Sequence, residues 1–156
     1  MNSPITLHVN GESAQVDAGL HDTLLTVLRD RLQLTAAKRG CNQGVCGSCT
    51  VALDGWPVRS CLSLAALCEG HEITTIEGAG TDPAMAVLQR QFIEQGAVQC
   101  GFCTPGILIS ARRLIADSPR PEIGEVQAAL SGNICRCTGY RKIIDAVLAA
   151  AAELAP

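Results

Sequence analysis

Nine cysteines are the residues of this chain best suited to chemistry, and eight of them fall into two quartets. The first quartet has the spacing C-x4-C-x2-C with a fourth cysteine after a longer gap: Cys41, Cys46, Cys49 and Cys61. The second consists of two close pairs separated by a long stretch: Cys100, Cys103, Cys135 and Cys137. Four thiolates that converge on one point bind iron–sulfur clusters or zinc. The sequence therefore predicts two metal centres.

The spacing of the first quartet is that of plant-type ferredoxins, whose four thiolates hold a [2Fe–2S] cluster. Structural zinc is the main alternative, because four-cysteine sites with close pairs suit tetrahedral Zn²⁺. Zinc modules usually pair one C-x2-C with another, however, and both C-x4-C-x2-C and Cys135-Arg136-Cys137 fit that pattern poorly. A zinc-stabilised interaction module would also be colourless, so a visible spectrum separates the two. We therefore predict two [2Fe–2S] clusters and a role in electron transfer.

A disulfide framework is the other alternative, and it requires an oxidising compartment. The first nine residues lack the basic region and apolar core of a signal peptide. The net charge of −3 arises without a long block of either sign, which disfavours a nucleic-acid partner. No apolar run reaches the ~18 residues of a transmembrane helix. We expect a cytoplasmic protein without membrane insertion, in which the leftover thiol, Cys68, is a buried core residue.

Glycines within and beside the cysteine motifs explain how these loops can hold an anionic cluster. They permit tight backbone with positive φ that directs N–H groups at sulfur: Gly40, Gly44, Gly47, Gly101 and Gly139. A helix that starts at Thr104-Pro105 would add the positive end of its dipole near Cys103. Arg136 could add positive charge, although a solvated side chain is the more frequent role for such an arginine.

The elements that must position the cysteines change in type near Gly78-Ala79-Gly80, which is predicted to link two domains. The segments predicted before it are strands over 5–9, 14–16, 50–53, 58–62 and 73–76, turns at 10–11 and 54–55, and one helix capped by Asp22. Strands with one crossing helix indicate a β-grasp, ferredoxin-like domain. We predict this domain over residues 1–78.

The second half is predicted to be helical. Its helices are expected to start at Pro83 after an Asp82 cap, at Thr104, at Glu122 and at Tyr140. Both cysteine pairs of the second quartet then lie in turns between helices. A helix–cysteine loop–helix arrangement that occurs twice predicts a pseudo-symmetric, all-α four-helix-bundle domain over residues 79–156, and an α+β fold for the whole chain.

Three sequence motifs resemble those of the molybdenum hydroxylases (the xanthine oxidase family). Residues 40–51, GCNQGVCGSCTV, resemble their N-terminal cluster motif, and residues 99–106, QCGFCTPG, resemble their second. Residues 131–140, SGNICRCTGY, resemble the third. Asn42 departs from the family, where glycine is frequent, but asparagine tolerates positive φ, so the loop should be preserved. The length resembles that of the separate iron–sulfur subunit, since no flavin or molybdenum region follows Pro156.

The resemblance implies an electron-transfer subunit of a multi-subunit molybdenum oxidoreductase, with no catalytic site in this chain. In the family, electrons pass from a molybdenum–pterin centre on a large subunit to the C-terminal cluster. They continue to the N-terminal cluster and usually to FAD on a medium subunit. Thr138-Gly139-Tyr140 resembles the form found in relatives with such a subunit.

Two residues match family positions at the pterin. Gln99 matches the glutamine that contacts the pterin, and Cys137 matches the cluster ligand whose thiolate also accepts a pterin hydrogen bond. On residue type alone, Gln99 would be a polar residue at a helix end. A free-standing two-cluster ferredoxin remains the alternative function. Such a protein would be active with exchangeable partners and would not co-purify with a large subunit.

Overall fold

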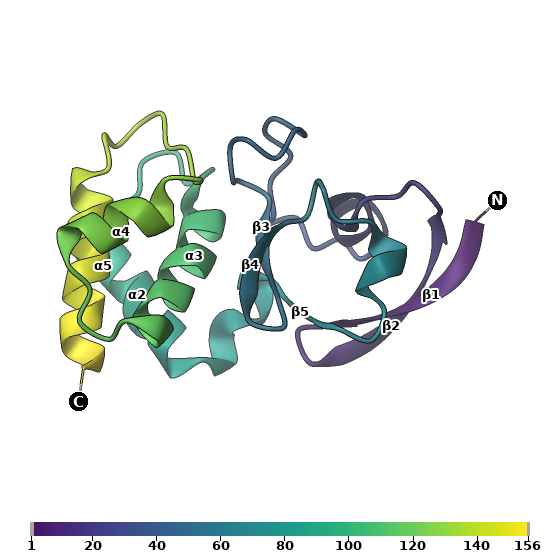
Figure 1. The fold of residues 1–156 in the computed structure, drawn as a ribbon, viewed down its shortest axis with the longest axis horizontal. Helices are drawn as coiled ribbons and strands as arrows, with labels where there is room; N and C mark the ends of the chain where they lie inside the picture. The colour runs from purple at the N-terminus through teal and green to yellow at the C-terminus, as the bar shows by residue number, and fades with distance from the viewer. Residues whose placement is uncertain (1, 156) are drawn as a thin grey trace.

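A mixed five-stranded sheet forms the first half of the chain (Figure 1). The computed structural model describes residues 2–155, with the side chain of Asn2 excepted, so the outer limits of the two predicted domains, Met1 and Pro156, lie outside the described residues. The strands are β1 (Asn2–Val9), β2 (Glu12–Gly19), β3 (Thr50–Leu53), β4 (Trp56–Arg59) and β5 (Glu72–Thr74). Their order across the sheet is β2-β1-β5-β3-β4. This sheet confirms the predicted ferredoxin-like half.

Pairing in the sheet follows from its two hairpins. β1 pairs antiparallel with β2 and parallel with β5, while β3 pairs antiparallel with both β4 and β5. Both predicted two-residue turns have positive φ throughout: Asn10 and Gly11 at 56° and 81°, and Asp54 and Gly55 at 49° and 81°. Such turns match the twist of the flanking strands. The last two strands are shorter than predicted, since β4 ends at Arg59 and β5 at Thr74.

The helix that crosses the sheet is shorter and less regular than predicted. It consists of α1 (Leu24–Thr26) and a π-helical turn over Val27–Arg31. Thr23 is its N-cap, whereas the Asp22 carboxylate accepts the N–H of Gly19 at 2.9 Å, so the prediction of an Asp22 cap is wrong. The apolar side chains of this helix are nevertheless buried in the core beneath the sheet, as their periodicity predicted.

The segment between the halves is packed rather than extended. Gly78-Ala79-Gly80 lies within a 3-10 helix over Ile76–Thr81, and Ala79 is buried in the core of the helical half. A Cβ on Gly78 would come within 2.3 Å of the Asn10 side chain. The segment does connect the two halves, but its tertiary contacts hold it in place, which the sequence did not indicate.

Four helices form the second half and confirm the predicted bundle. They are α2 (Pro83–Glu94), α3 (Thr104–Asp117), α4 (Ile123–Leu130) and α5 (Arg141–Leu154). α2 packs mainly on α5, while α3 packs on α4 and on β3 of the sheet. The Asp82 side chain caps α2 by accepting the N–H of Ala84 at 2.9 Å, as predicted. Gly96, with φ of +63°, follows the end of α2.

The loops that carry the cysteines gather along one edge of the molecule. In Figure 1 they are the blue loop above β3 and the teal and yellow-green loops above the helices. The β3–β4 hairpin stands beside α3, so the two halves meet next to these loops. Within residues 2–155, no helix is both long and apolar enough to cross a membrane.

Candidate metal centres

The cysteines of the first quartet form two pairs of interacting thiols. Cys41 interacts directly with Cys46, and Cys49 with Cys61. The first pair is half-buried, whereas Cys49 and Cys61 are buried. Among the residues that the structure describes, no three Cys, His, Asp or Glu side chains surround a point suited to one metal ion. Paired thiols do suit a [2Fe–2S] core, because each of its two irons takes two protein ligands.

Backbone N–H groups point at the sulfur of Cys41. The N–H groups of Cys46 and Gln43 donate to Cys41 Sγ at 3.3 and 3.4 Å. These two donors, Cys46 first, lower the pKa of Cys41 to about 6. The loop directs them inward through positive φ at Asn42 (56°) and Gly44 (77°), so Asn42 adopts the expected conformation. Donors aimed at sulfur fit the negative charge of a cluster.

Burial has the opposite effect on Cys61 of the inner pair, since it raises the pKa of this thiol to about 11. This thiol therefore holds its proton until a metal displaces it, because a ligating cysteine must be a thiolate. Burial also raises the pKa of Cys68, whose thiol lies in the core and donates to Leu64 O at 3.4 Å. The structure thus places Cys68 in the core, as predicted.

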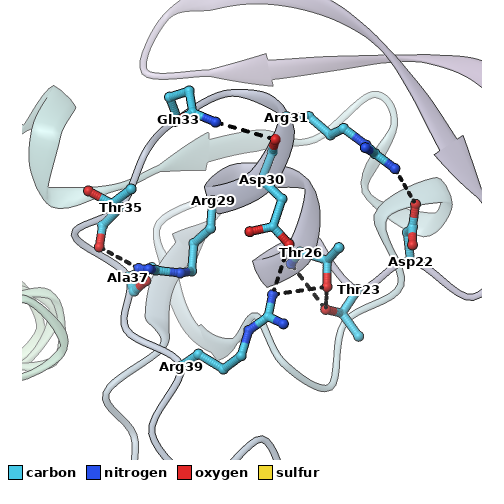
Figure 2. Close-up of polar contacts among 10 residues, drawn as sticks. All are labelled: Asp22, Thr23, Thr26, Arg29, Asp30, Arg31, Gln33, Thr35, Ala37 and Arg39. Carbon is cyan, nitrogen blue, oxygen red and sulfur yellow. Dashed lines mark hydrogen bonds and ion pairs between the residues drawn. The ribbon is translucent and has the colours of Figure 1, made fainter.

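A polar cluster anchors the segment that leads into the first cysteine loop (Figure 2). Arg29 Nη1 donates to the carbonyl oxygens of Thr35 and Ala37 at 2.7 and 2.8 Å. Arg39, two residues before Cys41, forms an ion pair with Asp30 at 3.2 Å. Arg29 and Asp30 both belong to the π-helical turn. This turn, which packs on the core, therefore fixes the position of residues 35–39, the segment that leads into the first cysteine loop.

The second quartet is also arranged as an inner and an outer pair. The Sγ atoms of Cys100 and Cys137 lie 3.5 Å apart, and both residues are exposed. Cys103 interacts with Cys135 deeper in the loop. Cys103 is the N-cap residue of α3, so the positive end of this helix lies beside it as predicted. Burial raises the pKa of Cys103 to about 12.

Side-chain hydroxyls support the inner pair of the second quartet. Thr138 Oγ1 lies 3.0 Å from Cys135 Sγ. Burial alone would raise the pKa of Cys135, but hydrogen bonds from the hydroxyl and N–H of Thr138, the N–H of Cys137 and the Cys103 thiol together outweigh it, and this pKa is lowered. The Tyr140 hydroxyl accepts the N–H of Cys135 at 2.8 Å and donates to Asn133 O at 2.9 Å. Sequence reasoning missed these hydroxyls, although both lie within the SGNICRCTGY motif.

Gln99 lies on the exposed side of the second quartet. It directly precedes Cys100 and is exposed, like Cys100 and Cys137. Its amide has no hydrogen-bond partner among residues 2–155, so it is free to bind a group outside this chain. The structure thus brings Gln99 and the outer cysteine pair to one loop region. Arg136 is exposed, in agreement with a solvated side chain.

The two cysteine loops touch each other. The N–H of Ile134, next to Cys135, donates to the carbonyl oxygen of Cys46 at 2.8 Å. A Cβ on Gly40 would lie 3.5 Å from the ring of Phe102, which sits between Cys100 and Cys103. Each quartet therefore contributes backbone to the surroundings of the other, and the two sites form one continuous region.

Two family models match the chain in succession. Residues 7–79 match the "2Fe-2S iron-sulfur cluster binding domain", and residues 75–148 match the "[2Fe-2S] binding domain". Together they cover residues 7–148, which include most of the sheet and of the four helices, and each includes one cysteine quartet. Both matches describe [2Fe–2S] proteins rather than zinc modules, so the chain carries two [2Fe–2S] clusters.

Relatives and solved structures match along almost the whole chain. The nicotinate dehydrogenase small FeS subunit of Eubacterium barkeri is 45% identical over 143 residues, 92% of this chain and 91% of that protein. The nicotine 6-hydroxylase small subunit of Paenarthrobacter nicotinovorans is 47% identical over 96% of this chain and 90% of its own length. A chain of quinoline 2-oxidoreductase from Pseudomonas putida 86 superimposes with a TM-score of 0.92 at 44% identity, covering 98% and 96% of the two chains. The protein therefore belongs to the small, two-cluster iron–sulfur subunits of the molybdenum hydroxylases, and it transfers electrons within a multi-subunit oxidoreductase.

Proposed function

We propose that each quartet binds one [2Fe–2S] cluster, with two thiolates on each iron. The ligands of the two clusters are Cys41, Cys46, Cys49 and Cys61, and Cys100, Cys103, Cys135 and Cys137. The arrangement of the thiols as two interacting pairs in each loop region supports this assignment. When bound, a [2Fe–2S] cluster takes up and releases one electron at a time. The role of the chain is to hold both clusters at a fixed separation and to shield their inner ligands from water.

The second cluster is proposed to receive electrons first, from a large molybdenum–pterin subunit. The exposed pair Cys100 and Cys137 and the unpaired amide of Gln99 support this order, because they are available to a partner on the same side. An amide offers both a donor and an acceptor, which suits the mixed hydrogen-bonding edge of a pterin. The Cys137 sulfur is proposed to accept a further hydrogen bond from that edge.

The first cluster is proposed to pass the electrons on, to FAD on a medium subunit or to another acceptor. Apolar side chains stand exposed beside this site, with Val45 between Cys41 and Cys46 at 60% and Leu62 next to Cys61 at 65% exposure. Exposed apolar groups of this kind favour a protein partner. The hydrogen bond between Ile134 N–H and Cys46 O supports direct passage from the second site to the first.

Two further assignments belong to this proposal. The boundary between the domains is placed at residues 78 and 79, and the matched segments 7–79 and 75–148 meet at that point. The cytoplasm is the proposed compartment, because none of the nine cysteines forms a disulfide in the described chain, and reducing conditions keep the eight proposed ligands available to the clusters.

Replacing Gln99 by Ala in the assembled enzyme tests the order of transfer. Loss of the amide leaves part of the buried pterin edge without a partner, which costs about 1–3 kcal/mol. We expect a lower pterin content or slower reduction of the second cluster, measured by rapid-freeze electron paramagnetic resonance, with both cluster signals retained. Gln95→Ala is the matched control, since Gln95 is also exposed and stands four residues earlier at the end of α2. Unchanged pterin content and kinetics in Gln99→Ala, or reduction of the first cluster before the second, would contradict the proposal.

A further inference from the structure

The side-chain amide of one asparagine connects the two cysteine loops and helix α3. Asn133 is buried, with 2% of its surface exposed, and lies two residues before Cys135. Its Nδ2 donates to Gly47 O at 3.1 Å and to Thr50 Oγ1 at 3.3 Å; Gly47 lies in the first cysteine loop, and Thr50 begins β3 directly after Cys49. Its Oδ1 accepts from Ser110 Oγ of α3 at 2.9 Å. The amide therefore joins three segments, with both of its N–H groups and one lone pair of Oδ1 bonded within the protein.

The backbones around this amide are in direct contact. Gly47 has φ of +73°, and a Cβ there would come within 2.2 Å of Gly132 O. A Cβ on Gly106 of α3 would lie 2.4 Å from Gly47 O. No side chain can enter between these segments without moving them apart. The close approach brings the loop between Cys46 and Cys49 against the loop that precedes Cys135.

A second side chain closes the edge of the same junction. Arg59, at the end of β4, donates to Gly132 O at 2.6 Å and to Thr50 Oγ1 at 2.7 Å. Arg59 thus braces the first loop against the second from the sheet side, while Asn133 does so from the helical side. Of the two, only Asn133 is fully buried at the contact, so its polar atoms lose the most if the loops separate.

We infer that Asn133 is the positioning residue that fixes the two cysteine loops relative to each other and thereby sets the coupling between the two clusters. The inference rests on the ligand sets of the proposed function. Because Asn133 touches the backbone on both sides within two residues of proposed ligands, its loss lets one loop shift or turn against the other. The Asn133 side chain does not hydrogen-bond to any proposed cluster ligand. Each cluster should therefore stay bound in its absence, while the distance and orientation between the two clusters change.

Asn133→Ala tests this inference in the full chain, purified with its partner subunits. When both clusters are reduced, their unpaired spins interact and split the electron paramagnetic resonance signals, and this splitting falls steeply with separation. We expect both individual signals in partly reduced samples, but a weaker splitting in fully reduced samples and slower electron transfer between the clusters. Ser110→Ala, which removes only the donor to Oδ1, should produce a smaller change in the same direction.

Asn10→Ala is the matched control for a mere loss of stability. Asn10 also joins distant segments, since its side chain exchanges hydrogen bonds with Thr75 at 2.9 and 3.0 Å, but it does not touch the cysteine loops. It should lower thermal stability and leave the splitting unchanged. Full wild-type splitting in Asn133→Ala would overturn the inference. If that variant does not assemble, unchanged splitting in Ser110→Ala would overturn it instead. Failure of the ligand assignment is distinguishable, because a variant in which a proposed ligand is replaced, such as Cys61→Ser, would then keep both individual cluster signals.

Discussion

The two cysteine sites supply hydrogen bonds to sulfur in different ways. In the first, the donors to Cys41 are backbone N–H groups, directed by positive φ at Asn42 and Gly44. In the second, Cys135 has the side-chain hydroxyl of Thr138 at 3.0 Å in addition to backbone N–H groups. Backbone donors cannot be removed by substitution without reshaping the loop, whereas a hydroxyl can. Single side-chain substitutions are therefore expected to change the hydrogen bonding to sulfur at the second cluster more readily than at the first.

The sites also differ in exposure, although each has an inner and an outer pair. The outer pair of the first site, Cys41 and Cys46, is half-buried, whereas Cys100 and Cys137 of the second are exposed. A site whose ligands are exposed in the isolated chain depends on a partner to exclude water. The comparison indicates that this chain itself excludes water from most of the first site. The second site needs a partner subunit to exclude water from its outer ligands.

The largest expected effect comes from Cys61→Ser, which tests whether the sites are independent. Cys61 is buried and interacts with Cys49, so the variant removes one of the ligands proposed for the first cluster and none of those proposed for the second. Iron should fall from roughly four to roughly two atoms per chain. One of the two electron paramagnetic resonance signals of the reduced protein should disappear. Elemental analysis and the spectrum together measure this.

Cys68→Ser is the matched control, because Cys68 is a buried cysteine of the same half whose thiol donates to Leu64 O. It should keep both signals and the full iron content. If Cys61→Ser loses both clusters while the chain stays folded, the two sites are not independent and the comparison between them fails.

An intermediate effect is expected from Tyr140→Phe, which affects the second site alone. The Tyr140 hydroxyl bonds both the N–H of Cys135 and the carbonyl of Asn133. Its removal leaves two backbone groups without their partner, at a cost of about 1–3 kcal/mol. The second cluster should be lost at a lower temperature than in wild type, as followed by its visible absorption. The first cluster is the internal control, and equal loss of both would contradict a local role for Tyr140.

Much of this architecture could be predicted because its signals are local in sequence. Each cysteine loop is a short motif, and its glycines and Asn42 lie between the cysteines that they help to position. The helices of the second half show clear apolar periodicity and conventional caps, such as Asp82 before Pro83. The hairpins at Asn10-Gly11 and Asp54-Gly55 follow from dipeptides that favour positive φ.

What could not be predicted depends on contacts between distant residues. The amide of Asn133 reaches Gly47 and Thr50, which lie 86 and 83 positions away, and no local pattern marks such a contact. The π-helical turn over Val27–Arg31 has the apolar spacing of an ordinary helix. Gly78-Ala79-Gly80 has the composition of a linker, but packing against Asn10 and burial of Ala79 override that composition.

The smallest expected effect comes from Thr138→Val, which keeps the shape of the side chain and removes its hydroxyl. Once Cys135 is an iron-bound thiolate it can only accept, so Thr138 must be the donor across the 3.0 Å contact. A hydrogen bond to sulfur stabilises the more negative, reduced cluster and so raises its reduction potential. Thr138→Val should therefore lower the potential of the second cluster and leave that of the first unchanged, as measured by redox titration followed by electron paramagnetic resonance. Thr138→Ser keeps the donor and should stay near wild type. An equal shift in the Ser and Val variants would mean that packing, and not the hydroxyl, distinguishes the second site from the first.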